Sequence, residues 1–285
     1  MGRLWIWVWT AVVLTWVPTV RAGELLVEPT ELAKQIGAGR VVVLDARSRG
    51  DYEAGHVPGA AHMDPGEWKK LSFQEGARTD AALWSKRIGA LGIDNEKPVV
   101  VYDEGTGLDA SRMWFLLHCW SVKRPQLLNG GFKAWAAAGL KTETQVQSPQ
   151  SAKFMAVRRD GAMVDKAQIC AVLPSKGMQI LDVRSQAEYD GQTKLAKRNG
   201  HIPGAIHLEW KQAADESGRF KSADELKALF SGAGLTHDKP IVTHCQSGGR
   251  ASHTYFALML AGFDNVKNYY DSWQDWGNDA DTPIE

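Results

Sequence analysis

Cysteine is scarce in this sequence: its 285 residues include only three, Cys119, Cys170 and Cys245. Three cysteines are too few for a disulfide framework, and no pair has the C-x-x-C spacing of a metal site or a dithiol redox motif. Cys119 and Cys170 lie in apolar helical runs, which favours a place in the core, although a bond between these two stays open. Cys245 is left as the candidate for chemistry.

An excess of either charge is also lacking. The sequence has 33 basic and 33 acidic residues, which gives a formal net charge of zero. No basic patch for nucleic acid or for an acidic lipid surface follows from that balance. We therefore expect no nucleic-acid partner.

A long hydrophobic run is missing as well. The uncharged stretch at residues 4–17 is shorter than the ~20 residues that a membrane-spanning helix needs. It follows Arg3 and precedes a Val-Arg-Ala stretch that ends on the small residue Ala22. We expect residues 1–22 to be a signal peptide and the protein to be exported to the periplasm as a monomer, with no stable membrane insertion after cleavage. An uncleaved membrane tether is the alternative.

The chain repeats itself. Four blocks recur in the same order, including a strand-like run that ends in D-x-R and a G-H-[VI]-P-G-A turn. The matching blocks are residues 41–48 with 178–185, 55–62 with 200–207, 97–101 with 239–243, and 131–135 with 272–276. This order predicts two copies of one fold.

Each copy alternates short apolar runs with helical patterns, which indicates an α/β domain with a mainly parallel sheet flanked by helices. The helical patterns cover residues 29–38, 80–91 and 109–120 in the first copy, and 164–173, 223–230 and 250–261 in the second. The polar segment that begins at Thr142 has no apolar period and reads as a linker. We predict domain 1 over residues 24–141, a linker over 142–156 and domain 2 over 157–285.

Residues 243–252, which read T-H-C-Q-S-G-G-R-A-S, place Cys245 between a β-branched run and a helical pattern. In a parallel sheet, ligands bind beyond the carboxyl ends of the strands. The small or flexible positions Gln246, Ser247, Gly248 and Gly249 allow successive backbone amides to converge on one point. The start of the following helix favours the thiolate form of Cys245, and the fixed positive charge of Arg250 suits an oxyanion beside it. These residues form a candidate catalytic and substrate-binding loop, and a buried cysteine before a tight turn is the structural alternative.

The first copy has Asp103 at the place of Cys245. Because a carboxylate is not a sulfur nucleophile, we predict that domain 1 is inactive and structural. A cysteine phosphatase would need five residues between its cysteine and arginine, whereas Cys245 and Arg250 are separated by four. Acyl transfer would need a histidine base, and His244, as the strand neighbour of Cys245, is expected to point to the opposite face.

From about Val27 onward, four motifs resemble those of the tandem-domain rhodanese family of thiosulfate and 3-mercaptopyruvate sulfurtransferases. They are the D-x-R-S strand ends, the G-H-[VI]-P-G-A turns, the Cys245 loop and the terminal W-Q-D-W-G-N-D-A-D-T-P-I. The resemblance implies that Cys245 takes a sulfane sulfur from an anionic donor as a persulfide. The persulfide sulfur would then pass to cyanide or a thiol, without metal or organic cofactor. Thiosulfate is the preferred donor; 3-mercaptopyruvate, or a persulfide carrier without turnover of its own, is the alternative.

Two departures concern the donor. The thiosulfate enzymes resemble C-R-K-G in the loop and the mercaptopyruvate enzymes C-G-[ST]-G, whereas this chain has C-Q-S-G. The family's two-domain members place a substrate-binding arginine just before the aromatic residue that matches Tyr189, where this chain has Glu188. Lys194, Lys197 and Arg198 could supply the missing charge, or form a solvated basic loop.

Arg184 is a candidate substrate-binding residue at the border of the active-site cleft that we expect beside the Cys245 loop. Its duplicate Arg47 lies in the copy without a nucleophile, so a structural pair with Asp182 is favoured. His201 and His207, which also have duplicates in that copy, are interpreted as structural.

Overall fold

The computed structural model describes residues 25–285. The predicted signal peptide, residues 1–22, lies outside the described residues. No helix within the described part of the chain is both long and apolar enough to cross a membrane.

The first half is built on a parallel sheet with strand order β1-β5-β4-β2-β3. Its strands are β1 (Leu26–Val27), β2 (Val42–Asp45), β3 (Ala61–His62), β4 (Val99–Tyr102) and β5 (Pro125–Leu128). Its helices are α1 (Pro29–Gly37), α2 (Arg49–Ala54), α3 (Pro65–Ser72), α4 (Ala81–Gly89), α5 (Leu108–Cys119) and α6 (Gly131–Ala137), with a 3₁₀ turn η2 (Ala77–Thr79).

The second half repeats this plan with the order β7-β6-β8-β9, again with parallel pairing. Its strands are β6 (Gln179–Asp182), β7 (Ile206–His207), β8 (Ile241–His244) and β9 (Val266–Asn268). Its helices are α7 (Lys166–Val172), α8 (Gln186–Tyr189), α9 (Ala223–Gly232), α10 (Gly249–Leu260) and α11 (Ser272–Trp276), with a 3₁₀ turn η3 (Trp210–Ala213). The prediction of two α/β copies with parallel sheets is confirmed.

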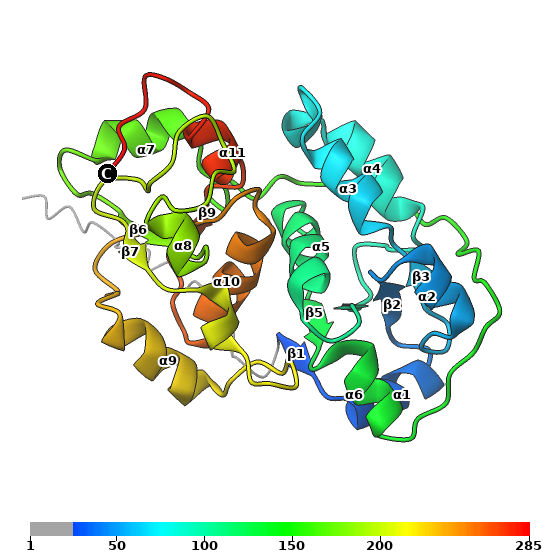
Figure 1. Ribbon diagram of the computed structural model, residues 1–285. Helices are drawn as coiled ribbons and strands as arrows, with labels where there is room; N and C mark the ends of the chain where they lie inside the picture. The colour runs from blue at the N-terminus through cyan, green and yellow to red at the C-terminus, as the bar shows by residue number, and fades with distance from the viewer. Residues whose placement is uncertain (1–24) are drawn as a thin grey trace, which may run out of the picture.

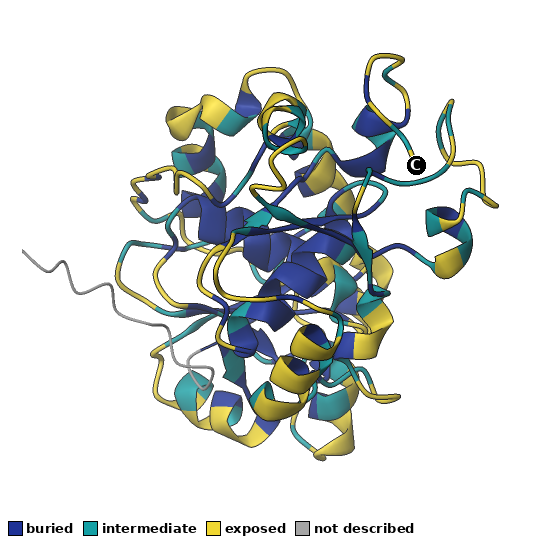
Figure 2. Ribbon diagram, turned by 90° about the vertical axis from the view of Figure 1, so that its left-hand side faces the viewer, coloured by how far each residue is buried: buried dark blue, intermediate teal, exposed yellow. Residues whose placement is uncertain are grey.

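Local sequence explains where the strands and helices form. Every residue of β4 and of β8 is buried, as expected for central strands covered on both faces. Capping boxes start α7, α8 and α9 at Asp165, Ser185 and Ser222, where a side chain satisfies the free amides of the first turn. Figure 2 shows the resulting separation of buried central elements from exposed outer helices.

The two halves meet through α5 and α10, which lie side by side between them (Figure 1). Aromatic rings fill this contact: Trp114 meets Phe256 edge to face at 4.8 Å between ring centroids, and Phe115 meets Tyr255 at 5.0 Å. One hydrophobic cluster therefore runs through both halves, while each sheet has a second cluster on its other face. Because each of these helices also starts at the end of a central strand, this contact fixes how the two strand-end loops face each other.

The polar segment predicted as a linker, residues 142–156, contains no helix and no named strand. It is nevertheless attached to the first half, because the Ala152 amide donates to the Gly89 carbonyl over 2.9 Å and Phe154 is buried. The exact boundaries of the two domains stay a prediction.

Candidate active site at the Cys245 loop

Cys245 directly follows β8, at the carboxyl end of a central strand, and α10 begins four residues later. Gly248 caps this helix in the left-handed conformation, with φ of 81°. A Cβ at Gly248 would lie 2.7 Å from the Tyr270 carbonyl oxygen, and one at Gly249 would lie 2.5 Å from Arg112 Nη2. Gly248 is therefore required both by its left-handed conformation and by the nearby Tyr270 backbone, whereas a side chain at Gly249 would displace the Arg112 guanidinium.

The Cys245 side chain is only 1% exposed. Its backbone N–H donates to Ser272 Oγ over 3.1 Å, and the same oxygen lies 3.9 Å from the Cys245 Sγ. The Cys245 carbonyl accepts a hydrogen bond of 2.9 Å from the Trp273 amide. The start of α11 thus holds the cysteine in place, and Ser272 adopts a positive φ of 58° to do so.

Arg250, in the first turn of α10, is paired with Glu188 of α8. Arg250 Nη1 and Nη2 donate to the two carboxylate oxygens of Glu188 over 2.6 and 2.8 Å. Burial acts to lower the pKa of Arg250, but Glu188 and the neighbouring Cys245 raise it above the ordinary value. Burial acts to raise the pKa of Glu188, and the bonds from Arg250 hold it below the ordinary value. Both groups are charged, so Glu188 compensates the charge of Arg250.

The corresponding loop of the first half contains its own anion. Asp103 directly follows β4, and its carboxylate accepts hydrogen bonds from four backbone amides, those of Gly105, Gly107, Asp109 and Ala110, over 2.9 to 3.2 Å. This loop, at a strand end and opening a helix, therefore directs four amides at the side chain that stands in the position of the nucleophile. In the second half the same position holds the Cys245 sulfur.

Arg184 has a structural position. Its guanidinium donates to the Asp182 carboxylate through Nε over 2.9 Å and to the Gly200 carbonyl through Nη2 over 2.8 Å, and it lies 4.4 Å from the centroid of the Trp273 ring. Its side chain is 1% exposed. The duplicate Arg47 makes the same contacts with Asp45 and a turn carbonyl. The Arg184 side chain is thus enclosed by the protein, which supports the structural pair with Asp182 that the sequence favoured over substrate binding.

The histidines also follow the structural interpretation. His201 Nδ1 and His56 Nδ1 each lie within hydrogen-bonding distance of a carbonyl of the preceding helix, and His207 Nε2 lies 2.9 Å from the Arg184 carbonyl. His244 is fully buried, with Nε2 3.5 Å from Asp182 Oδ2. Burial lowers the pKa of His244 to about 4, against the pull of Asp182, so this ring is neutral at neutral pH.

The insert at residues 192–199, which the first half lacks, borders the Cys245 loop. Gln246 Nε2 donates to the Leu195 carbonyl over 3.0 Å. Of the three basic side chains considered for donor binding, Arg198 is bound to the C-terminal segment, for example to the Thr282 carbonyl over 2.8 Å. Lys194 and Lys197 are exposed. The insert therefore meets the loop through a backbone carbonyl.

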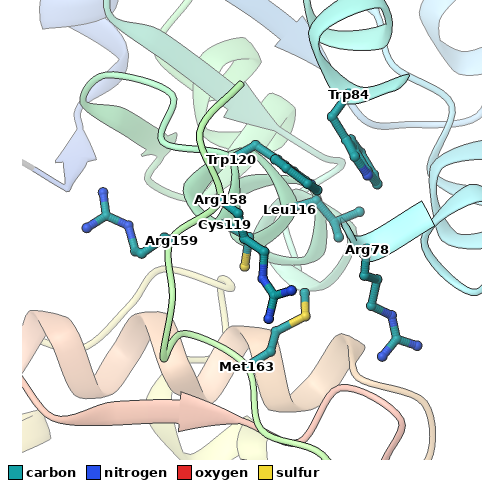
Figure 3. A pocket seen from close by; sticks show the side chains of 8 residues that line it. All are labelled: Arg78, Trp84, Leu116, Cys119, Trp120, Arg158, Arg159 and Met163. Atoms are coloured by element: carbon teal, nitrogen blue, oxygen red, sulfur yellow. The ribbon is translucent and has the colours of Figure 1, made fainter. Parts of the chain in front are cut away.

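The other two cysteines are free and are not bonded to each other. Cys119 lies at a cavity of about 20 Å³ that is bordered by Arg158 and Arg159 (Figure 3). Burial raises the pKa of the Cys119 thiol in spite of these arginines, and the cavity is little larger than one water. Cys119 is a core residue, as the sequence predicted. Over residues 25–285 no cluster of His, Cys, Asp or Glu side chains could hold a metal ion.

Comparison with known proteins identifies the two copies. The sequence model of the rhodanese-like domain matches residues 28–138 and 168–279. The chain belongs to the rhodanese family. Rhodanese domains carry sulfur transfer, so this chain is a tandem-domain sulfurtransferase.

Its relatives within the rhodaneses match over most of their length. A thiosulfate sulfurtransferase from Azotobacter vinelandii is 33% identical, with 92% of this chain and 97% of that protein covered. A 3-mercaptopyruvate sulfurtransferase from Escherichia coli is 30% identical over 89% of this chain and 95% of that protein. The crystal structure of a 3-mercaptopyruvate sulfotransferase from E. coli, 29% identical, superposes with a TM-score of 0.75 and covers 87% of this chain and 98% of the other.

Three contributors to this rhodanese loop were missed from the sequence: Ser272, Tyr270 and Arg112. Arg112 comes from the other domain, and nothing in the order of residues places it near position 247. Ser272 did carry a signal, because it stands where the repeat has Gly131. A side chain retained where the duplicate has glycine, at a positive φ, indicates that the hydroxyl is used.

Proposed function

We propose that this rhodanese transfers the outer sulfur of thiosulfate, through a persulfide on Cys245, to cyanide or to a thiol. The Cys245 thiolate attacks the outer sulfur and forms the new S–S bond. The S–S bond of thiosulfate breaks, and sulfite leaves with the electron pair. A nucleophilic acceptor then takes the outer sulfur from the persulfide and restores the Cys245 thiolate.

The observation that carries this proposal is the amide cradle of the duplicate loop. The four amides around the Asp103 carboxylate show what a strand-end loop of this fold binds. By analogy, with cysteine in place of aspartate, the amides of the loop from Gln246 to Arg250 would surround a persulfide anion, and fixed amide dipoles stabilise such an anion without reorganisation.

The choice of thiosulfate as donor is supported by two relatives. The thiosulfate sulfurtransferases of A. vinelandii and Pseudomonas aeruginosa are 33% and 32% identical, each over 92% of this chain. The 3-mercaptopyruvate sulfurtransferase of E. coli has similar coverage at 30% identity. The experiment must therefore present both donors.

The test is the mass of the purified protein after exposure to thiosulfate or to 3-mercaptopyruvate, with Cys245→Ser as the control. We expect thiosulfate to add one sulfur atom to Cys245, cyanide to remove it as thiocyanate, and Cys245→Ser to gain none. A gain from 3-mercaptopyruvate alone would overturn the choice of donor. A persulfide that cyanide does not discharge would identify a carrier, and no gain from either donor would refute sulfur transfer through Cys245.

A further inference from the structure

The helix pair α5 and α10 brings each domain into contact with the strand-end loop of the other. Arg112 is the fifth residue of α5, and its Nη1 donates to the Ser247 carbonyl over 2.8 Å and to the Tyr270 hydroxyl over 3.1 Å. Arg112 is 8% exposed, and Tyr270 is fully buried. A side chain of the domain that lacks the nucleophile therefore touches the backbone of the Cys245 loop.

This contact fixes the peptide unit between Ser247 and Gly248. In a planar trans peptide the C=O and the following N–H point in opposite directions. A Ser247 carbonyl held by Arg112 therefore turns the Gly248 amide away from Arg112. In the duplicate loop the equivalent amide, that of Gly107, donates to the Asp103 carboxylate over 3.0 Å. By this equivalence, Arg112 orients an amide that faces the sulfur.

The two loops are treated differently by the opposite domain. The fifth residue of α10 is His253, whose ring lies against Gly107, with Cδ2 3.4 Å from where a Cβ of that glycine would be. Among residues 25–285 neither His253 nitrogen has a hydrogen-bond partner, and burial lowers the pKa of His253 to about 3. The Asp103 loop is thus contacted by the neutral ring of His253, at the position where the Cys245 loop is contacted by the guanidinium of Arg112.

Arg112 also places a positive charge behind this loop, and Asp109, one turn earlier on α5, is near enough for Arg112 to act on its pKa, which Arg112 lowers and burial raises. Arg250 is paired with Glu188, and Arg184 with Asp182, whereas within residues 25–285 Arg112 makes no salt bridge. The Arg112 guanidinium donates to a carbonyl and a hydroxyl and lies 5.6 Å from the centroid of the Tyr270 ring, and a largely buried cation in this setting is stabilised further by an anion nearby. A thiolate or persulfide in the loop provides that anion.

We propose that Arg112 is a positioning residue that the N-terminal domain supplies to the Cys245 loop, where it fixes the Ser247–Gly248 peptide and contributes the positive charge that favours the sulfur anion. This gives the domain without a nucleophile a direct role in the reaction. The inference rests on the proposed function for its donor, but not for the reactivity of Cys245.

The test compares Arg112→Met and Arg112→Lys in the full-length protein. The first readout is the rate at which iodoacetamide alkylates Cys245 at neutral pH, followed by peptide mass mapping, and the second is kcat/KM for thiosulfate. We expect Arg112→Met to lower both about 10-fold, because positioning and charge are lost together. Arg112→Lys should recover part of the alkylation rate, since its charge remains.

The matched control is Arg219→Met, which removes the interdomain ion pair of 2.7 Å between Arg219 and Glu28 without touching the Cys245 loop. The proposal is overturned if the alkylation rate of Cys245 and the kcat/KM for thiosulfate in Arg112→Met both lie within twofold of the values in Arg219→Met. Tyr270→Phe, which removes one of the two acceptors of Arg112, decides the question if Arg112→Met does not fold: a slower alkylation supports the proposal, and an unchanged rate refutes it. Alkylation needs no donor, so it tests Arg112 even if thiosulfate proves not to be a substrate.

Discussion

At position 272 the chain has a serine where its duplicate has Gly131, and both residues have a positive φ, of 58° and 60°. A non-glycine residue in this conformation costs on the order of 1–3 kcal/mol. The Ser272 hydroxyl accepts the Cys245 amide over 3.1 Å and donates to the Tyr269 carbonyl over 2.8 Å. The strain is thus accompanied by one hydrogen bond that holds the Cys245 backbone and a second that fixes the Ser272 hydroxyl on the Tyr269 carbonyl.

Two variants separate the strain of Ser272 from the function of its hydroxyl. Ser272→Gly and Ser272→Ala both remove the oxygen that holds Cys245, so both should transfer sulfur more slowly, by about 10-fold. Only glycine relieves the backbone, so Ser272→Gly should unfold with a free energy about 1 kcal/mol higher than Ser272→Ala. Urea unfolding and a thiocyanate assay check the two parts. Full activity in both variants would show that the hydroxyl has no role.

Single residues were predictable where the repeat or the chain neighbourhood exposed them. Cys245 and Asp103 were found because each follows a recognisable strand, and the structure places them at equivalent strand ends. Arg112 was not found because its contact with the loop crosses between domains, and Tyr270 was not found because its contact with Gly248 joins segments more than 20 residues apart in the sequence. Glu188 was recognised as unusual because it stands where the family has an arginine, but its ion pair with Arg250 does not follow from a sequence without distances.

At the scale of elements, the short helix α8 and the first turn of α10 are joined by one carboxylate. Glu188 is the third residue of α8, where it completes a capping box with Ser185, and it also pairs with Arg250. The equivalent position in α2 is Asp51, which lies near its own cap Ser48. The capping function is therefore common to both domains, and the pairing with the Cys245 loop is confined to the second.

Glu188→Gln should improve the use of thiosulfate. Glutamine keeps the capping position and an acceptor for Arg250, but it frees the positive charge that Glu188 now compensates. We expect the KM for this dianion to fall about 3- to 10-fold at low salt, with a smaller change at high salt. Asp51→Asn, the matched change in α2, should leave the KM unaltered. An unchanged or higher KM in Glu188→Gln would contradict this electrostatic role.

The elements themselves followed well from pattern. All six predicted helical segments are present within a few residues of their expected ends, and β2 and β6 end at the aspartate of each D-x-R motif. Periodicity could not show that the two-residue strands β1, β3 and β7 exist, because their pairing depends on long-range neighbours rather than on their own sequence.

For the whole molecule, the contact between α5 and α10 buries titratable rings in a shared core. His118 and His253 lie on these two helices, and burial lowers the pKa of each to about 3. His244 lies beneath the Cys245 loop with a pKa lowered to about 4. An unfolded histidine has a pKa of about 6.5. Between about pH 6.5 and these folded values, the unfolded chain binds protons that the folded chain does not.

The protein should therefore lose stability as the pH falls below about 6.5, before most carboxylates titrate. Above that pH the rings are neutral in both states and carry no penalty. Below it, each of the three histidines costs up to about 1.4 kcal/mol per pH unit until its folded pKa is reached. Urea unfolding at pH 7.5, 6.5 and 5.5 measures the change of the unfolding free energy with pH.

His253→Phe tests the contribution of one buried histidine. The phenylalanine ring still packs between Trp210 and Phe220 but binds no proton, so the slope of the unfolding free energy against pH should fall by about the contribution of one histidine. Equal slopes in wild type and His253→Phe would show that the buried interface does not govern acid stability.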